Sequence, residues 1–193
     1  MRSYFDQTMA ILKESVDSMD TKVFSRLSED CVKTISNGGK IVVSGLGKNV
    51  PVCDKFVGTM LSLGLNAGFM HTNSAVHGDL GLVHDGDLVI VLTKSGETVE
   101  SIYLVEQLKK RNVEIWLLSF TPKSTLTDSL GDNCLILDLE HEGDLWNIAP
   151  SNSTTVNLIV LQGLAWSIAK EMNCSLDCFK MNHPGGHIGE ILK

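Results

Sequence analysis

The sequence predicts a three-layer α/β/α sandwich built on a five-stranded parallel sheet. Short strand-like runs alternate with helical segments along the chain, which is the order expected of an α/β fold. The strand-like runs are apolar throughout rather than at every second residue, as in a parallel sheet covered on both faces. The chain has 193 residues, of which 43% are hydrophobic, and it shows no repeat or linker. We therefore expect residues 1–193 to form one domain.

Two amphipathic helices are predicted at the start of the chain. The first has an apolar residue at every third or fourth position, namely Phe5, Met9, Leu12, Val16 and Met19. Such spacing places these side chains on one face of a helix. The second helix covers about residues 23–35, with Asp20 or Thr21 as its cap and Gly38 after its end. We expect residues 1–38 to form a helical hairpin that belongs to the same domain.

Strands and helices then alternate over the rest of the chain. Strands are predicted at residues 40–44, 65–70, 87–92, 113–119 and 134–139. Helices are predicted at residues 50–63, 98–111 and 153–172. The run at 87–92 is uninterruptedly apolar after its first residue, which indicates a strand in the middle of the sheet.

Composition excludes several classes of partner. The chain carries 16 Lys and Arg against 23 Asp and Glu, a formal net charge of −7, which argues against a nucleic-acid partner. The longest apolar run, residues 156–168, is interrupted by Asn157 and Gln162 and is shorter than the roughly 20 residues of a membrane span. The five cysteines are odd in number and scattered, and the acidic Asp6 and Glu14 do not fit the apolar core of a secretory leader, so none is expected. We expect reduced thiols, no membrane contact and a cytoplasmic location.

The first turn that could bind a ligand is Ser44-Gly-Leu-Gly-Lys48, which follows a predicted strand. Glycines let the backbone approach a ligand closely, and ligands of such folds bind beyond the carboxyl ends of the strands. We expect Ser44, Gly47 and Asn49 to contribute to a phosphate site, with Lys48 supplying positive charge. The pattern is neither a dinucleotide-binding fingerprint nor a P-loop, so a simple tight turn with an exposed lysine is the alternative.

The second turn, residues 93–98, contains the hydroxyls of Thr93, Ser95 and Thr98 and also Lys94. It precedes a predicted helix, whose first N–H groups and dipole favour an anion. The turn therefore predicts a phosphate site. An ordinary helix cap formed by the same hydroxyls is the alternative.

Histidines and a glutamate stand in unusual loops. His77 lies in a glycine-flanked loop, and Glu142 lies just before an Ala-Pro turn. His183 and His187 lie in a Pro-Gly-Gly segment near the last residue. No cluster of carboxylates and cysteines completes a metal site around the two histidines, so no metal is expected.

Together these segments resemble the sugar isomerase (SIS) domain, and within it the D-arabinose 5-phosphate isomerase branch. The matching segments are Ser44-Gly-Leu-Gly-Lys48, Ala75-Val-His-Gly-Asp-Leu-Gly81, Ser95-Gly-Glu-Thr-Val-Glu100, Leu139-Glu-His-Glu142, Ala149-Pro-Ser-Asn-Ser-Thr154 and Asn182-His-Pro-Gly-Gly186. They occur in the order of the family and cover almost the whole chain. The resemblance does not extend to the pair of cystathionine-β-synthase-type modules that follow in many relatives.

The resemblance implies aldose–ketose isomerisation of a phosphosugar, D-arabinose 5-phosphate with D-ribulose 5-phosphate, through an enediol(ate) and without a cofactor. It implies that the hydroxyl turn holds the phosphate. It also implies that the polar groups of the active site are Lys48, Glu100, Glu142 and His183, with His77 on a further loop of the family pattern. We expect Glu142 and His183 to lie near solvent as the acid/base pair, in which either residue could take the C2 proton. A carboxylate is a suitable base for a carbon acid if burial raises its pKa.

An oligomer, with a tetramer favoured, is a further expectation. The apolar stripe of the first helix and the long helix at 153–172 offer more hydrophobic surface than one sheet can cover. The resemblance implies that subunits pair through these helices and complete one another's sites with the C-terminal histidine.

Departures from the family pattern leave the substrate open. Asn49 stands where the family usually has serine, and Lys94 stands where an uncharged residue is common. Asp144 and Trp146 replace small and sulfur-bearing residues in the expected pocket wall. An isomerase of another phosphosugar, such as 3-hexulose 6-phosphate, and a non-catalytic module that binds a phosphosugar or sugar nucleotide therefore stay as alternatives.

Overall fold

A parallel sheet organises the computed structural model, which describes residues 2–191. Its strands are β1 (Ile41–Gly45), β2 (Ala67–His71), β3 (Leu88–Leu92), β4 (Glu114–Ser119) and β5 (Cys134–Ile136). They lie in the order β2-β1-β3-β4-β5, and every neighbouring pair is parallel. All residues of β1 and β3 are buried, which explains why their sequences are apolar or small at every position.

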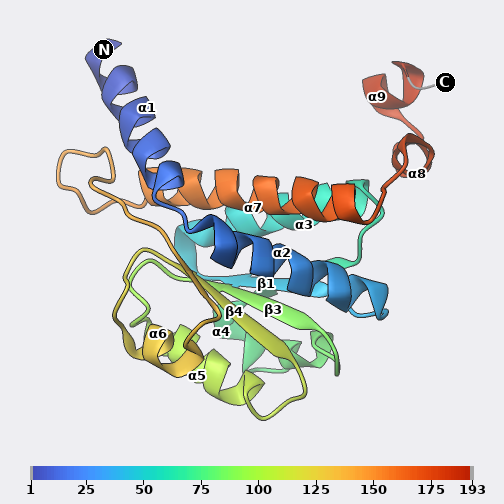
Figure 1. Cartoon of the computed structure of the whole chain (residues 1–193), viewed down its shortest axis with the longest axis horizontal. Helices are drawn as coiled ribbons and strands as arrows, with labels where there is room; N and C mark the ends of the chain where they lie inside the picture. The colour runs from blue at the N-terminus through green and yellow to red at the C-terminus, as the bar shows by residue number, and fades with distance from the viewer. Residues whose placement is uncertain (1, 192–193) are drawn as a thin grey trace.

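Helices cover both faces of this sheet (Figure 1). One face carries α1 (Arg2–Asp17), α2 (Thr21–Ser36), α3 (Val50–Ser62) and α7 (Asn152–Glu171). The other face carries α4 (Thr72–Ala75), α5 (Val99–Leu108) and α6 (Thr125–Leu130). The predicted three-layer α/β/α architecture with its N-terminal helical hairpin is confirmed.

Local sequence signals explain where the helices begin and end. The Asp20 side chain accepts hydrogen bonds from the N–H groups of Lys22 and Val23 and so caps α2. Gly38 follows the end of that helix with φ +86°, a conformation that costs glycine little. Ser124 caps α6 in a capping box with Thr127, a short helix that the sequence analysis did not predict.

The long helix α7 buries one face and exposes apolar side chains on another. Val156, Val160, Leu164 and Ile168 are buried within the chain's own core. Ile159 and Trp166 of the same helix are exposed, as are Phe5 of α1 and the apolar side chains at 145–148. No helix between residues 2 and 191 is long and apolar enough to span a membrane.

The last strand, β5, is shorter than predicted. The sequence suggested residues 134–139, but the strand ends at Ile136. The N–H of Asp138 donates to Ser18 Oγ at the end of α1 (2.9 Å), so the chain leaves the sheet to bond with the hairpin. Two further short helices, α8 (Leu176–Met181) and α9 (Gly186–Ile191), follow α7 and were not predicted.

Candidate active site

A small cleft lies where β1 and β3 end and α7 begins. Its lining includes Lys48, Asn49, Lys94, Ser153, Thr154 and Asn157. The two lysines come from the two turns that the sequence analysis selected, one after each strand. This is the edge of the sheet where ligands of parallel α/β folds bind. The structure therefore brings both turns and the start of α7 to one polar site.

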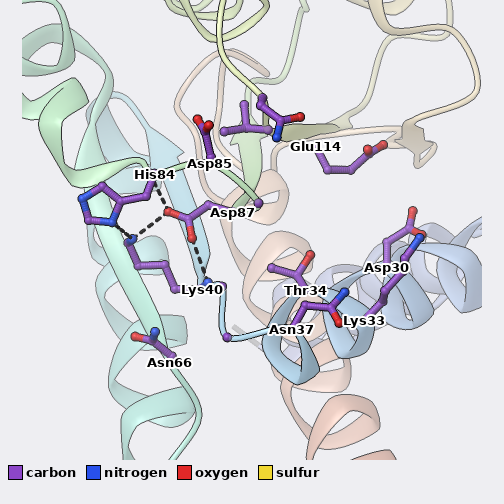
Figure 2. A pocket seen from close by; sticks show the side chains of 15 residues that line it. Asp30, Lys33, Thr34, Asn37, Lys40, Asn66, His84, Asp85, Asp87 and Glu114 are labelled. Atoms are coloured by element: carbon purple, nitrogen blue, oxygen red, sulfur yellow. Dashed lines mark hydrogen bonds and ion pairs between the residues drawn. The ribbon is translucent and has the colours of Figure 1, made fainter.

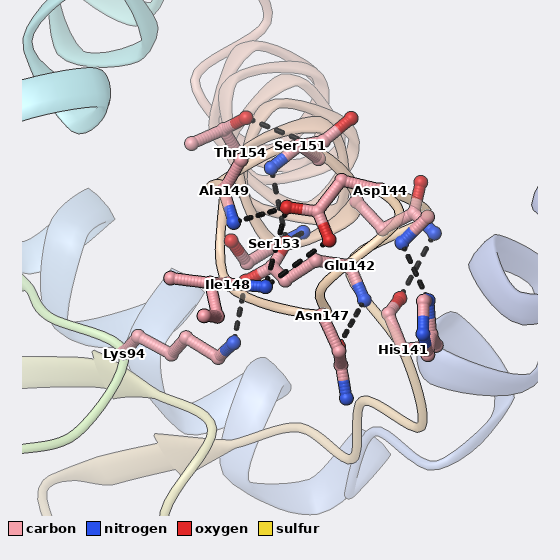
Figure 3. Close-up of polar contacts among 12 residues, drawn as sticks. Lys94, His141, Glu142, Asp144, Asn147, Ile148, Ala149, Ser151, Ser153 and Thr154 are labelled. Carbon is pink, nitrogen blue, oxygen red and sulfur yellow. Dashed lines mark hydrogen bonds and ion pairs between the residues drawn. The ribbon is translucent and has the colours of Figure 1, made fainter.

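Glu142 is buried behind the cleft, where three donors hold it, two of them from Lys94 and Ser153 of the lining (Figure 3). Its Oε1 accepts a hydrogen bond from Lys94 Nζ at 2.5 Å, within an ion pair. Its Oε2 accepts from the backbone N–H groups of Ser151 and Ser153, each at 3.0 Å. These are orphan donors at the start of α7, so the carboxylate caps the helix and also faces its positive end.

The environment of Glu142 favours its ionised form. Its side chain is fully buried, and burial alone would raise the pKa. The hydrogen bonds from Lys94 and from the N–H groups of Ser153 and Ser151 outweigh burial and hold the pKa below its ordinary value. The expectation of a carboxyl near solvent was wrong, because the side chain is buried. Its pKa is lowered rather than raised, because of three donors that the sequence does not reveal.

The hydroxyl turn after β3 is not an ordinary helix cap. Thr98 is the N-cap residue of α5, yet no side chain in the described chain caps that helix start. Its Oγ1 lies 3.2 Å from Oγ1 of the buried Thr93, and Ser95 Oγ accepts from the N–H of Glu97 at 3.1 Å. The first turn of α5 therefore keeps N–H groups for an anion, as the phosphate interpretation requires.

Ser44 does not serve the role that the sequence suggested. Its side chain is fully buried, and its Oγ lies 3.0 Å from Oγ1 of Thr72. The pair joins the ends of β1 and β2, so this hydroxyl is occupied away from the cleft. Gly47 adopts φ +59° and starts the short helix that carries Lys48, which is exposed.

Glu100 and His77 lie on the same side of the sheet but do not line the cleft. Glu100 is exposed in the first turn of α5, and His77 is exposed just after α4, which follows β2. The structure therefore places both near the expected edge and leaves their contact with a substrate as a prediction.

His183 follows α8, which lies beyond the far end of α7 (Figure 1). Its ring stacks on Phe179 at 4.1 Å, and its Nδ1 lies 2.8 Å from the Phe179 carbonyl oxygen. The neighbouring Asn182 donates to the carbonyls of Leu61 and Ser62 at the end of α3. Because Glu142 holds the start of the 20-residue α7 and His183 follows its end, a helix of roughly 30 Å separates them. One chain does not bring the proposed acid/base pair together.

A larger cavity of about 470 Å³ opens at the opposite edge of the sheet (Figure 2). Asp87 is buried there, forms an ion pair with Lys40 Nζ at 2.6 Å, and accepts from the N–H groups of Lys40 and His84. Lys40 Nζ also lies 3.1 Å from His84 Nδ1. These contacts fasten the loops that enter β1 and β3, so the cluster stabilises the fold and lies away from the polar cleft.

Asn157 is one of the cleft residues that were not assigned to a site from the sequence. Its Nδ2 donates to Asn49 Oδ1 at 3.0 Å, joining α7 to the turn after β1. The signal was present, because an amide interrupts an otherwise apolar helical run. A buried polar side chain in such a run is expected to have a hydrogen-bond partner or a functional role.

Comparison with known proteins identifies the family. The model of the SIS domain matches residues 34–167, so the chain belongs to the SIS family. An uncharacterised protein of Helicobacter pylori is 34% identical over 187 residues, 97% of this chain and 56% of that protein. Arabinose 5-phosphate isomerase KdsD of Yersinia pestis is 31% identical over 186 residues, 96% of this chain and 56% of that enzyme. The chain thus spans little more than half the length of these relatives.

A solved structure agrees with this assignment. The protein c3406 of Escherichia coli CFT073, determined in complex with arabinose 5-phosphate, superposes with a TM-score of 0.87 at 29% identity. The match covers 95% of both chains. The fold of this chain is therefore the SIS fold.

Proposed function

We propose that this chain is a phosphosugar aldose–ketose isomerase, and that it interconverts D-arabinose 5-phosphate and D-ribulose 5-phosphate. The observation that carries the proposal is the uncapped start of α5, with its hydroxyl turn, together with a cleft that two lysines line and a buried carboxylate that one of these lysines binds. The similarity to KdsD and to the sugar-phosphate complex of c3406 supports the choice of substrate.

In the proposed mechanism, the turn holds the phosphate and leaves the sugar carbons in the cleft. Backbone N–H groups of α5 and the hydroxyls of Ser95 and Thr98 bind the phosphate oxygens. The reaction moves the C2 proton of the aldose to C1, so a base must first accept it and then return it. Lys48 stabilises the negative charge that develops on the enediolate oxygen.

Glu142 is the carboxylate available for the proton transfer within one chain. It is ionised at neutral pH and therefore ready to accept a proton, although its bond to Lys94 weakens its basicity. The proton returns to carbon in the next step, so the ion pair with Lys94 is restored.

We propose that a neighbouring copy of the chain supplies His183, in a homo-oligomer that is a tetramer. Light scattering that finds a stable 21.0 kDa monomer would contradict this arrangement.

The direct test is turnover by the purified protein. Pentose and hexose phosphates are supplied one at a time in D2O, and proton NMR follows both the isomer and deuterium incorporation at the carbon that gains the proton. We expect ribulose 5-phosphate from arabinose 5-phosphate. Conversion of a hexulose 6-phosphate alone would favour the other isomerase, and binding without turnover would favour a non-catalytic module.

The phosphate turn is tested by Ser95→Ala. Hydrogen bonds to charged groups contribute about 1.5–3 kcal/mol, so the KM for the phosphosugar should rise at least about tenfold with folding intact. Ser25→Ala, on an exposed position of α2, is the matched control and should change nothing. An unchanged KM for Ser95→Ala would contradict phosphate binding by Ser95 and indicate that the turn is only structural.

A further inference from the structure

One buried polar atom in the cleft has no partner among the described residues. The carbonyl oxygen Oδ1 of Asn157 accepts no hydrogen bond, although the residue is only 2% exposed. An unpaired buried acceptor costs about 1–3 kcal/mol, so its presence requires a reason. Asn157 also lines the cleft between the two lysines and the start of α7.

A neighbouring amide engages the nitrogen end of this side chain. Nδ2 of Asn157 donates to Asn49 Oδ1 at 3.0 Å, which leaves Oδ1 of Asn157 without a partner among the described residues. Asn49 comes from the turn after β1, and Asn157 stands one helical turn after Ser153 on the same face of α7. The amide pair therefore leaves one acceptor unpaired in the wall of the cleft.

Two of the donors that line the cleft are engaged elsewhere. Lys94 Nζ, which lines the same cleft, donates to Glu142 Oε1. The hydroxyl of Thr154 donates back to the Ser151 carbonyl. A ligand that carries both a phosphate and hydroxyl groups would complete the site, since its hydroxyl hydrogen can reach an acceptor that the protein leaves open.

We propose that Asn157 is a specificity-determining residue, which accepts a hydrogen bond from one hydroxyl of the bound phosphosugar, and that Asn49 holds it in position. The inference rests on the proposed function, because it concerns the same ligand and the same cleft. It makes the amide pair the feature by which this chain selects among phosphosugars, whereas the turn at α5 binds any phosphate.

The test compares Asn157→Leu with Gln162→Leu. Gln162 lies further along α7, its Oε1 is also buried and unpartnered among the described residues, and it does not line the cleft, so it is a matched control. Replacing either amide by leucine removes an unsatisfied acceptor, so both variants should fold. The melting temperature of Gln162→Leu should equal or exceed that of the wild type, and that of Asn157→Leu should lie near it, because this variant also loses the hydrogen bond to Asn49.

Binding is measured calorimetrically with inorganic phosphate, with D-arabinose 5-phosphate, and with its monodeoxy analogues at the second, third and fourth carbons. Wild type and Gln162→Leu should bind one analogue about 2-fold to 13-fold more weakly than the parent sugar, the range expected for one neutral hydrogen bond. Asn157→Leu should bind that analogue and the parent equally, with unchanged affinity for inorganic phosphate.

The outcomes separate the two proposals. The same ratio of parent to analogue affinity in Asn157→Leu and wild type would overturn the role of Asn157, even if the protein isomerises the sugar. Discrimination that disappears in Asn157→Leu, together with no turnover by wild type, would overturn the isomerase proposal alone. A wild type that binds inorganic phosphate but no sugar would overturn both.

Discussion

Glu142→Gln should destabilise the protein at neutral pH and much less in acid. The carboxylate accepts from two backbone N–H groups at the start of α7 and from Lys94, whereas a glutamine presents one neutral oxygen to the same donors. Charge-assisted bonds exceed neutral ones by about 1 kcal/mol each, giving about 2 kcal/mol for the two N–H groups. The ion pair adds about 0–1 kcal/mol, since the Lys94 side chain is 46% exposed.

The expected loss is therefore about 2–3 kcal/mol, or about 4–12 °C in melting temperature for a domain of this size. Its pH dependence follows from the direction of the pKa shift. Because the folded pKa of Glu142 lies below the ordinary value of 4.5, its stabilisation is complete above that pH and declines as the pH falls through the folded pKa. In strong acid both proteins carry an uncharged side chain, so the difference should vanish.

Urea unfolding followed by circular dichroism at about pH 7 and at about pH 3.5 measures this difference. Glu106→Gln, at an exposed position of α5, is the control and should match the wild type at both pH values. Equal unfolding free energies of Glu142→Gln and wild type at neutral pH would refute the reasoning. A difference that persists unchanged in acid would also refute it, because the effect would then not depend on charge.

Two further substitutions test the turn and the C-terminal segment. Gly96→Ala should destabilise the fold by at least about 1–2 kcal/mol, because φ is +67° and a Cβ would lie 2.0 Å from Ser124 Oγ, whereas Gly58→Ala in α3 should be neutral or stabilising by thermal unfolding. His183→Ala should lower turnover of the folded enzyme by about 10²–10⁴ with affinity nearly unchanged, and His187→Ala should have a much smaller effect. A lower melting temperature with normal turnover would show that His183 only stabilises the C-terminal segment, through its contact with Phe179 of α8.

The sequence by itself determined the layers of the fold. Apolar runs such as residues 88–92 are buried on both sides, and a helix-covered parallel sheet is the arrangement that satisfies them. Local rules also located the turns after β1 and β3, because glycines and hydroxyls there follow directly from the end of a strand. These features depend on neighbours in sequence, which is why reading the chain alone recovers them.

Tertiary structure decided which polar atoms of the site have hydrogen-bond partners within the described chain and which do not. Ser44 and Lys94 both lie in turns that predict ligand contact. In the folded chain, however, the Ser44 hydroxyl hydrogen-bonds with Thr72, and Lys94 donates to Glu142. The lowered pKa of Glu142 depends on donors that lie up to 48 residues away in the chain. Such pairings arise only when separate segments pack, and no local pattern encodes them.

The same reason explains the separation of Glu142 and His183. The order of the sequence places Glu142 before the predicted helix and His183 after it, but the shared family motif assigns both to one site. The long helix places the carboxylate at its start and the histidine beyond its end, so the two can share a site only across a contact between copies. The residue types were set by the sequence, whereas their distance was set by the rigid length of one helix.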